Sequence, residues 1–211
     1  MRTCSRTLKH TVHLDKVKSE RFLLPISKKK THVIEIHAGQ ITTTDLTVLL
    51  PPASNFEPSG GYSKIAAVER HHNTGKIGVA VAKGYGIKNG AVASSVSHDS
   101  HNIIVIGDND VDMAIAVNEI IRTQGGYTVV ENGKVYETLA LPIMGLMSDA
   151  GFENVNEALQ RMIQKAHQMG VAAQIDPFVT LSFLALPVIP ELRITPRGIC
   201  KMTAKGPIIL S

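Results

Sequence analysis

Residues 97–102, with the sequence SHDSHN, form the densest cluster of chemically capable side chains in the chain. Imidazoles and carboxylates can bind metal ions or move protons, while hydroxyls and amides can hydrogen-bond a substrate. The two histidines are three residues apart without a third ligand at a defined spacing, which makes them weak candidates for a metal site. A loop whose polar side chains bond their own backbone is the structural alternative. The candidate side chains are those of Ser97, His98, Asp99, His101 and Asn102.

A second polar cluster, Glu69, Arg70, His71 and His72, directly follows a short apolar run. Segments that follow a strand often carry binding or catalytic groups. An ion pair between Glu69 and Arg70 beside a surface histidine is the structural alternative, because such pairs are common. If the strands next to the two clusters are neighbours, both clusters converge at one edge of a sheet.

The acidic stretch 107–112, GDNDVD, resembles the late Gly-Asp-x-x-Asn-Asp element of haloacid-dehalogenase-type phosphatases, in which acidic residues hold magnesium. That resemblance implies a phosphatase-like hydrolase that uses Asp108 and Asp110. Such enzymes also need an Asp-x-Asp near the end of an early strand, and none precedes this stretch. The alternative is that these acids lie at a helix N-terminus, where the helix dipole favours negative charge.

The composition excludes several classes of protein. A chain of 211 residues, of which 44% are apolar, can bury a core. The net charge is +4, but with 4% aromatic residues and no Trp we expect no nucleic-acid partner. No run approaches the roughly 20 apolar residues that span a bilayer, so we expect a cytoplasmic protein without a membrane partner. Cys4 and Cys200 have no CxxC spacing and predict neither a zinc site nor a disulfide framework.

The first part of the chain predicts β structure. Residues 31–50 alternate and carry β-branched side chains, which predicts two strands around a turn at Ala38-Gly39. Residues 11–24 are a weaker strand candidate. The Pro-, Ser- and Gly-rich residues 51–61 then interrupt every regular pattern. We therefore predict a β-rich appendage over residues 1–50, a linker over 51–61 and a main domain over 62–211.

The main domain begins with short apolar runs at 65–68 and 77–82 that predict strands. Residues 91–96 are small and apolar, and they suit either a strand or a helix. Residues 103–106 are continuously apolar, which predicts a central strand covered on both faces. A buried helix over 111–121 follows, with Asp108 or Asn109 as its N-cap.

The remaining elements alternate between strands and helices. Asn132-Gly133 predicts a type I′ hairpin between two β-rich runs. Apolar residues at helical spacing from Val155 to Met169 predict an amphipathic helix that stops at Gly170. Residues 176–190 are apolar and bounded by prolines, so they are expected to be buried, as helix or as strand. The predicted fold class is α/β (α+β): a mixed β-sheet packed with helices and preceded by the short β-rich appendage.

Several stretches, in this order, resemble the C-terminal region of bacterial adenine deaminases, members of the amidohydrolase superfamily. The segment HDSHN is the most specific of them. In one departure, Thr195-Pro196-Arg197-Gly198 stands where the family pattern has Thr-Asp-Arg-Gly, which puts any role of that aspartate in doubt. The matching stretches are 68–71 (VERH), 74–78 (TGKIG), 83–86 (KGYG), 94–102 (SSVSHDSHN), 141–149 (LPIMGLMSD), 176–178 (DPF) and 186–192 (LPVIPEL).

The resemblance implies hydrolysis of adenine to hypoxanthine and ammonia in purine salvage, with manganese, iron or zinc held by a catalytic barrel. No His-x-His motif occurs here, and 211 residues leave no room for a (β/α)₈ barrel of roughly 250 residues. No cofactor site is therefore evident in this chain. We expect it to be inactive without a barrel supplied by another chain, and Met1 to begin a truncated or split gene product.

Two roles remain open within this resemblance. In the first, Glu69, Arg70 and His71 together with residues 97–102 line a surface that faces the active-site mouth of the barrel, by hydrogen bonding rather than metal ligation. In the second, the chain is a catalytically dead module that binds a purine or a metal, or that forms a homo-oligomer.

Overall fold

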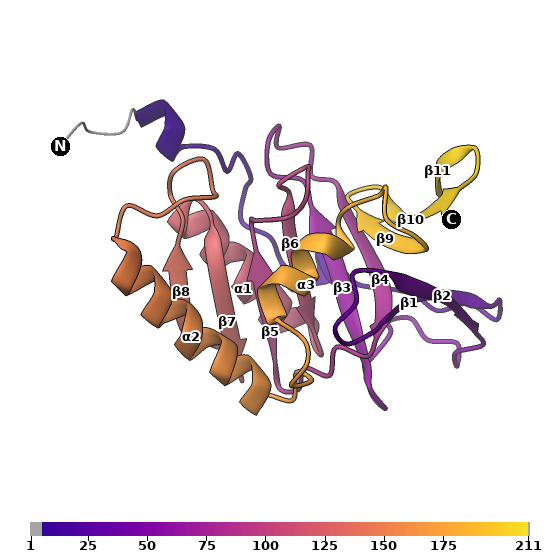
Figure 1. The fold of residues 1–211 in the computed structure, drawn as a ribbon. Helices are drawn as coiled ribbons and strands as arrows, with labels where there is room; N and C mark the ends of the chain where they lie inside the picture. The colour runs from indigo at the N-terminus through magenta and orange to yellow at the C-terminus, as the bar shows by residue number, and fades with distance from the viewer. Residues whose placement is uncertain (1–5, 211) are drawn as a thin grey trace.

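The computed structural model describes residues 6–210, which form one large and one small β-sheet with three α-helices (Figure 1). The large sheet has the strand order β2-β1-β4-β3-β6-β5-β7-β8 and the small sheet has the order β11-β10-β9. All neighbours in the large sheet are antiparallel except the parallel pair β1–β4, so the sheet is mixed. The strands are β1 (Thr31–Ile36), β2 (Thr43–Val48), β3 (Tyr62–Val68), β4 (Ile77–Lys83), β5 (Gly90–Ser94), β6 (Ile103–Gly107), β7 (Gly126–Glu131), β8 (Lys134–Ala140), β9 (Leu192–Thr195), β10 (Gly198–Thr203) and β11 (Gly206–Ile209).

Helices cover both faces of the large sheet, as Figure 1 shows. Helices α2 (Phe152–Gln168) and α3 (Pro177–Leu184) lie on one face together with the small sheet, and we call this side of the molecule the α2–α3 face. Helix α1 (Asp110–Thr123) lies on the other face. This is an α+β architecture, and the described residues contain no (β/α)₈ barrel, as predicted.

The central strand prediction is confirmed. Every residue of β6 is buried, because β6 pairs with β3 and β5 at its two edges and its side chains pack into the hydrophobic cores on both faces of the sheet. In the β3–β6 register, Val68 pairs with Ile103, so the end of β3 lies beside the beginning of β6. This register brings the segments after Val68 and before Ile103 to the same end of the sheet.

Local signals placed several elements correctly. Asn109 is the N-cap of α1, and its side chain accepts a hydrogen bond from the backbone N–H of Asp112 at 2.8 Å. Asn132 and Gly133 have φ values of 50° and 78°, as a type I′ turn between β7 and β8 requires. Helix α2 ends at Gln168, and Gly170 follows with φ of 101°.

Two ambiguous stretches are resolved by packing. Residues 90–94 form the strand β5, which pairs with β6 and β7 on its two sides. Within residues 176–190, the side chain of Asp176 caps the two free N–H groups of Phe178 and Val179, and Pro177 occupies the first turn of helix α3.

The strand prediction for residues 11–24 is wrong. This segment crosses α1 without a strand partner and contains only the short 3₁₀ helix Ser19–Phe22, preceded in the chain by another at Arg6–Lys9. Its backbone groups bond to side chains of the α1 region instead: Val17 donates to Asn118 Oδ1 at 2.8 Å and Val12 donates to Gln124 Oε1 at 3.2 Å. These bonds replace the ladder that a strand would need.

The predicted appendage contributes its two strands to the large sheet, through the parallel pairing of β1 with β4. The buried guanidinium of Arg193 also ties this hairpin to β9, because it donates to Thr43 Oγ1 at 2.7 Å and to Ile41 O at 2.6 Å. Residues 51–61 contain no regular strand or helix. The division of the chain at these residues stays a prediction.

Two further sequence expectations concern cysteines and membranes. Cys200 is a buried free thiol, while Cys4 lies outside the described residues. Among residues 6–210, no helix combines the length and the apolar character that crossing a bilayer requires.

Candidate functional site

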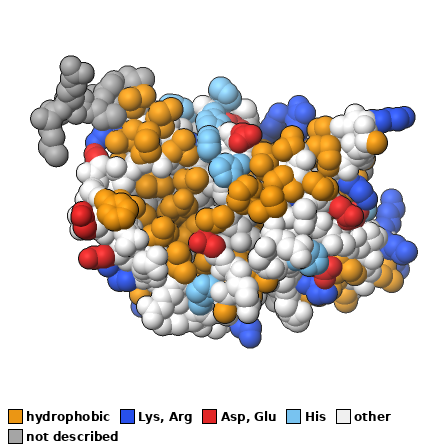
Figure 2. All heavy atoms as spheres, viewed as in Figure 1, with side chains coloured by type: hydrophobic (Ala, Val, Ile, Leu, Met, Phe, Trp, Pro, Cys, Tyr) orange, Lys and Arg blue, Asp and Glu red, His pale blue; other side chains and the backbone are white. Residues whose placement is uncertain are grey.

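The two polar clusters meet at one end of the sheet, which confirms the predicted convergence. The backbone N–H of Arg70 donates to Asn102 Oδ1 at 3.3 Å, and His71 Nε2 donates to the carbonyl of Ser100 at 2.8 Å. Figure 2 shows histidine side chains gathered at this end of the molecule. We call residues 69–72 and 97–102 together the polar end.

Arg70 is the structural centre of the polar end. Its side chain is buried, and its Nε donates to the carbonyl of His101. One terminal nitrogen donates to Thr11 O at 2.9 Å and Thr11 Oγ1 at 3.1 Å, and the other donates to Met144 O at 3.0 Å. Burial lowers the pKa of Arg70 to about 10, so the guanidinium remains charged at neutral pH. The Arg70 side chain thus links the segments at Thr11, His101 and Met144, which are distant from one another in sequence.

Close backbone packing supports this arrangement. Gly145 has φ of 72° and lies so near Arg70 that a Cβ atom there would approach its Nη1 to 2.7 Å. Only glycine combines this backbone conformation with this proximity. The loop 141–147 is therefore shaped around the guanidinium.

Glu69 organises the turn that follows β3. Its carboxylate accepts hydrogen bonds from the backbone N–H groups of His71 at 2.5 Å, His72 at 2.9 Å and Thr74 at 3.1 Å, and from the Thr74 hydroxyl at 3.0 Å. Burial opposes its ionisation, but these hydrogen bonds outweigh that effect and lower the pKa of Glu69. The predicted ion pair with Arg70 is wrong, because the two side chains bind different partners.

We expect Glu69→Gln to lower the free energy of unfolding at pH 7 by about 1–3 kcal/mol, because the amide nitrogen cannot accept the bonds that one carboxylate oxygen accepts. Since folding lowers the pKa of Glu69, its stabilisation is present above the ordinary glutamate pKa and is lost as the pH falls through the lowered value. The stability difference between wild type and variant should therefore narrow below about pH 4. Urea unfolding at several pH values measures it.

The exposed Glu153 is the matched control, and Glu153→Gln should change stability by less than about 0.5 kcal/mol. A difference for Glu69→Gln that stays constant between pH 7 and pH 3 would contradict the role assigned to its carboxylate.

The loop 97–102 has a buried frame and an exposed crest. In the frame, Ser97 Oγ donates to Asn102 O at 2.6 Å, and the backbone N–H of His101 donates to Ser97 O at 2.7 Å. At the crest, the side chain of His98 is 38% exposed and that of Asp99 is 88% exposed. Both predictions therefore apply to parts of this segment: some of its polar groups bond its own backbone, and others are exposed and able to bind a partner.

Helix α3 supports the crest. The backbone N–H of His98 donates to the carbonyl of Ser182 at 3.1 Å, and the rings of His98 and Phe183 have their centroids 5.0 Å apart. Ser182 and Phe183 were not among the site residues predicted from the sequence. Their only signal was the buried character expected of residues 176–190, which does not specify a contact with residue 98.

His98 and His101 do not form a metal site as they are arranged. No group of three His, Cys, Asp or Glu side chains suited to a metal ion occurs within residues 6–210, so the two rings, whose centroids are 6.5 Å apart, lack a third ligand beside them. Burial, with a contribution from the Arg70 charge, lowers the pKa of His101. Its buried Nδ1 has no hydrogen-bond partner among residues 6–210.

The acidic stretch around α1 has structural partners. Asp108 accepts from the backbone N–H of Gly90 at 2.9 Å, and Asp110 pairs with Lys64 Nζ at 2.5 Å. Asp112 accepts from the backbone N–H of Gly133 at 2.8 Å. These bonds agree with the alternative in which the acids serve the helix N-terminus and its surroundings.

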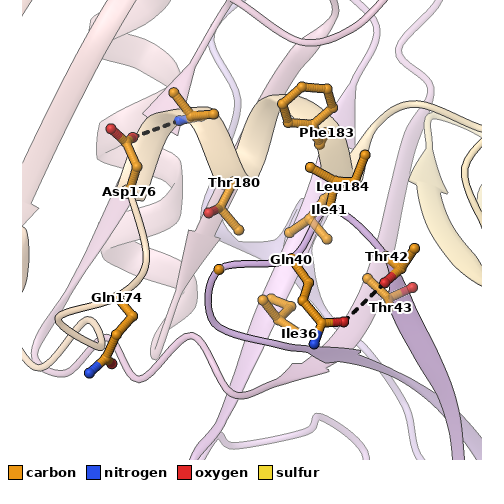
Figure 3. A pocket seen from close by; sticks show the side chains of 12 residues that line it. Ile36, Gln40, Ile41, Thr42, Thr43, Gln174, Asp176, Thr180, Phe183 and Leu184 are labelled. Carbon is orange, nitrogen blue, oxygen red and sulfur yellow. Dashed lines mark hydrogen bonds between the residues drawn. The ribbon is translucent and has the colours of Figure 1, made fainter.

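A cavity of about 190 Å³ lies between α3 and the β1–β2 turn (Figure 3). Apolar side chains form part of its lining, and the polar side chains of Gln40, Gln174, Asp176 and Thr180 lie around it. One Asp176 oxygen already caps α3, so its carboxylate is held in place. The cavity is smaller than the roughly 300 Å³ of typical drug-sized sites and suits a small ligand.

Comparison with known proteins identifies the family. The adenine deaminase C-terminal domain family matches residues 40–205. This chain belongs to that family. Its similarity to the adenine deaminase of Desulfitobacterium hafniense is 47% identity over 200 residues, covering 94% of this chain and 35% of the relative. For the Bacillus subtilis adenine deaminase the identity is 44% over 181 residues, covering 84% and 31%. The chain thus spans about a third of the length of the curated relatives it matches.

The family match includes the polar end, α3 and the hairpin β9–β10. The departure at residues 195–198 lies in the turn of that hairpin, which packs tightly on β4. A Cβ atom on Gly78 of β4 would lie 2.0 Å from the carbonyl oxygen of Thr195. In this adenine deaminase C-terminal domain, the turn therefore has a packing role that does not depend on the missing aspartate.

Proposed function

We propose that this chain is the C-terminal part of an adenine deaminase system, and that it supports hydrolysis of adenine to hypoxanthine and ammonia only when a metal-binding barrel region is joined to it. The observation that carries the proposal is the similarity to adenine deaminases over nearly the whole chain but only a third of their length. The barrel would hold the manganese, iron or zinc, and the complex would act in purine salvage in the cytoplasm.

The contacts of the carboxylates in this chain support a metal site in the barrel region rather than in this chain. A hydrolytic metal site needs carboxylate or imidazole ligands that are free to bind the ion. Glu69, Asp108 and Asp110 have hydrogen-bond or ion-pair partners within the fold, and although His98 and Asp99 are exposed, no group of three His, Cys, Asp or Glu side chains suited to a metal ion occurs within residues 6–210. We therefore place metal activation of water outside this chain and derive no step through a metal here.

The exposed crest of the polar end is the part we assign to the active-site mouth. Asp99 and His98 present a carboxylate and an imidazole outward, while Arg70, Glu69, Ser97 and Asn102 fix the loops that carry them. In this proposal the crest contacts the barrel mouth or the adenine by hydrogen bonds. The buried residues act as positioning residues.

A chimera tests the proposed function. The chain alone, supplied with manganese, iron or zinc, should show no adenine deamination. The same chain replacing the matching C-terminal third of the Desulfitobacterium hafniense enzyme should restore it. Within the chimera, His98→Ala should lower kcat/KM at least about 10-fold, in the range of a positioned proton-transferring or hydrogen-bonding group. Ammonia release measures each case.

His167→Ala provides the control, because His167 lies in α2 and bonds to the carbonyl of Val171, away from the polar end. Turnover by the isolated chain that His98→Ala abolishes would overturn the requirement for a barrel. Equal kcat/KM for His98→Ala and His167→Ala would overturn the assigned role of the crest.

A specific observation favours a second candidate, a catalytically dead module that binds a purine. The cavity beside α3 combines apolar walls with the amides of Gln40 and Gln174, threonine hydroxyls that include that of Thr180, and the fixed carboxylate of Asp176, which can bond to the edge of a heterocycle (Figure 3). Calorimetry of the isolated chain with adenine distinguishes the two. Micromolar binding that Thr180→Val weakens, together with an inactive chimera, would favour the module.

A further inference from the structure

Several large apolar side chains on the α2–α3 face are exposed. Phe152 at the beginning of α2 is 78% exposed, Val179 in α3 is 53% exposed, and Met147 in the preceding loop is 51% exposed. Figure 2 shows hydrophobic side chains spread across the middle of this face, with most charged groups towards its periphery. A contiguous exposed apolar area of this kind usually marks an interaction surface.

Helix α3 has the composition of an internal helix. Its sequence, PFVTLSFL, contains no charged residue, and such helices normally lie inside a protein. In this chain only one side of α3 packs on the sheet, through Phe178, Leu181 and Leu184, which leaves Val179 outward. The outward side of α3 is therefore exposed, although the sequence of α3 is typical of a helix that is buried on all sides.

A groove continues the apolar area towards the beginning of α2. Its volume is about 520 Å³, and it lies between α2, strands β7 and β8, and the loop that precedes α2. An aromatic or aliphatic side chain of a partner could fill it, as in the anchoring pockets of protein interfaces. The apolar side chains that line it are Tyr127, Leu139, Leu141, Leu146, Met147, Phe152, Val155 and Leu159.

The opposite face differs because the chain covers part of it. The segment 12–22 crosses α1 and adds Val12, Val17 and Phe22 to the core on that side. It is held there by the hydrogen bonds to Asn118 and Gln124. No segment of residues 6–210 plays this part across the outward side of α3.

We propose that the α2–α3 face is the docking surface for the remaining two thirds of an adenine deaminase, the part of the relatives that this chain does not match. The inference rests on the proposed function and adds the surface through which it operates. The relatives supply the missing length, since this chain covers only 35% of the Desulfitobacterium hafniense protein. Phe183 in α3 also contacts the ring of His98, so docking on this face brings the crest to the edge of the interface.

Cysteine labelling tests the docking surface with a matched pair. Val179 and Val111 have similar exposure, 53% and 56%, and both lie in the first turn of a helix, but on opposite faces of the sheet. Val179→Cys and Val111→Cys are made in the isolated chain and in the chimera, and maleimide labelling is followed by peptide mass spectrometry. We expect both thiols to react at similar rates in the isolated chain. In the chimera, labelling at 179 should slow at least about 10-fold while labelling at 111 is unchanged.

Labelling of Cys200, which is buried in the folded chain, would reveal a chimera that does not fold. In that case a co-expression experiment tests the proposal. The intact chain is co-expressed with the tagged remainder of the Desulfitobacterium hafniense enzyme. Wild type and Val111→Asp should co-purify with it, while a Val179→Asp/Phe152→Asp variant should not. Equal retention of all three variants, or retention of none, would overturn the proposal.

The other outcomes separate this inference from the proposed function. Adenine turnover by the chimera without slower labelling at 179 would overturn the docking surface alone. Slower labelling without turnover would support the docking surface and count against the proposed function. Protection of residue 179 in the isolated chain that increases with its concentration would identify a second copy as the occupant and overturn the proposal.

Discussion

Arg70→Met is expected to lower the free energy of unfolding by about 3–5 kcal/mol, because several buried oxygen acceptors lose their donor at once and each such loss costs about 1–3 kcal/mol. Arg70 is 2% exposed, and the four hydrogen bonds of its guanidinium end on His101, Thr11 and Met144. Methionine fills similar volume but donates none of these bonds, so buried carbonyl groups lose their partners. Chemical denaturation followed by circular dichroism measures the change.

Arg70→Lys should recover little of this loss, because one ammonium group cannot reach three separate segments with the geometry of the planar guanidinium. The exposed Arg197 is the matched control, and Arg197→Met should shift stability by less than about 0.5 kcal/mol. Arg70→Met with wild-type stability would show that Arg70 is not the structural centre of the polar end.

Lys64→Met should produce the second large effect, again about 3–5 kcal/mol. Lys64 lies in β3 with 1% exposure, and its ammonium donates to Asp110 Oδ1 at 2.5 Å, to Asn55 Oδ1 at 2.6 Å and to Phe22 O at 3.1 Å. Burial lowers the pKa of Lys64, although the carboxylate of Asp110 opposes that shift. Removing the ammonium leaves the carboxylate of Asp110 without its cation.

A double-mutant cycle checks that the pair itself is responsible. The combined variant Lys64→Met/Asp110→Ala should be more stable than the sum of the single effects implies, with a coupling of about 1–3 kcal/mol. The exposed Lys76 serves as control, and Lys76→Met should leave the unfolding midpoint almost unchanged. A coupling near zero would exclude the pair as the source of the effect.

The polar end has two sets of residues with different roles. Arg70, Glu69, Ser97 and Asn102 are buried and bind groups of the chain itself. His98 and Asp99 lie at the exposed crest. Substitutions of the buried residues should lower the free energy of unfolding. Substitutions of His98 and Asp99 should change only the activity of the complete enzyme.

Short-range patterns in the sequence determined a large share of the fold. The apolar run 103–106, the Asn132-Gly133 turn and the helical spacing ending at Gly170 each depend on residues within one element, and each prediction is confirmed. The polar clusters were also recognisable, because their residue types are unusual wherever they lie in the fold. Their meeting followed from one long-range fact, the pairing of β3 with β6.

What each cluster does was decided only by tertiary structure. Arg70 is 59 positions from Thr11 and 74 from Met144, and Lys64 is 46 from Asp110, so no local pattern could pair them. Residues 11–24 had strand-like composition, but the side chains of α1 satisfied their backbone instead. Local composition sets which conformation a segment prefers, whereas the partner that satisfies a buried polar group depends on how the elements pack. For this reason the sequence by itself identified the polar end, and only the folded chain divided it into buried supports and an exposed crest.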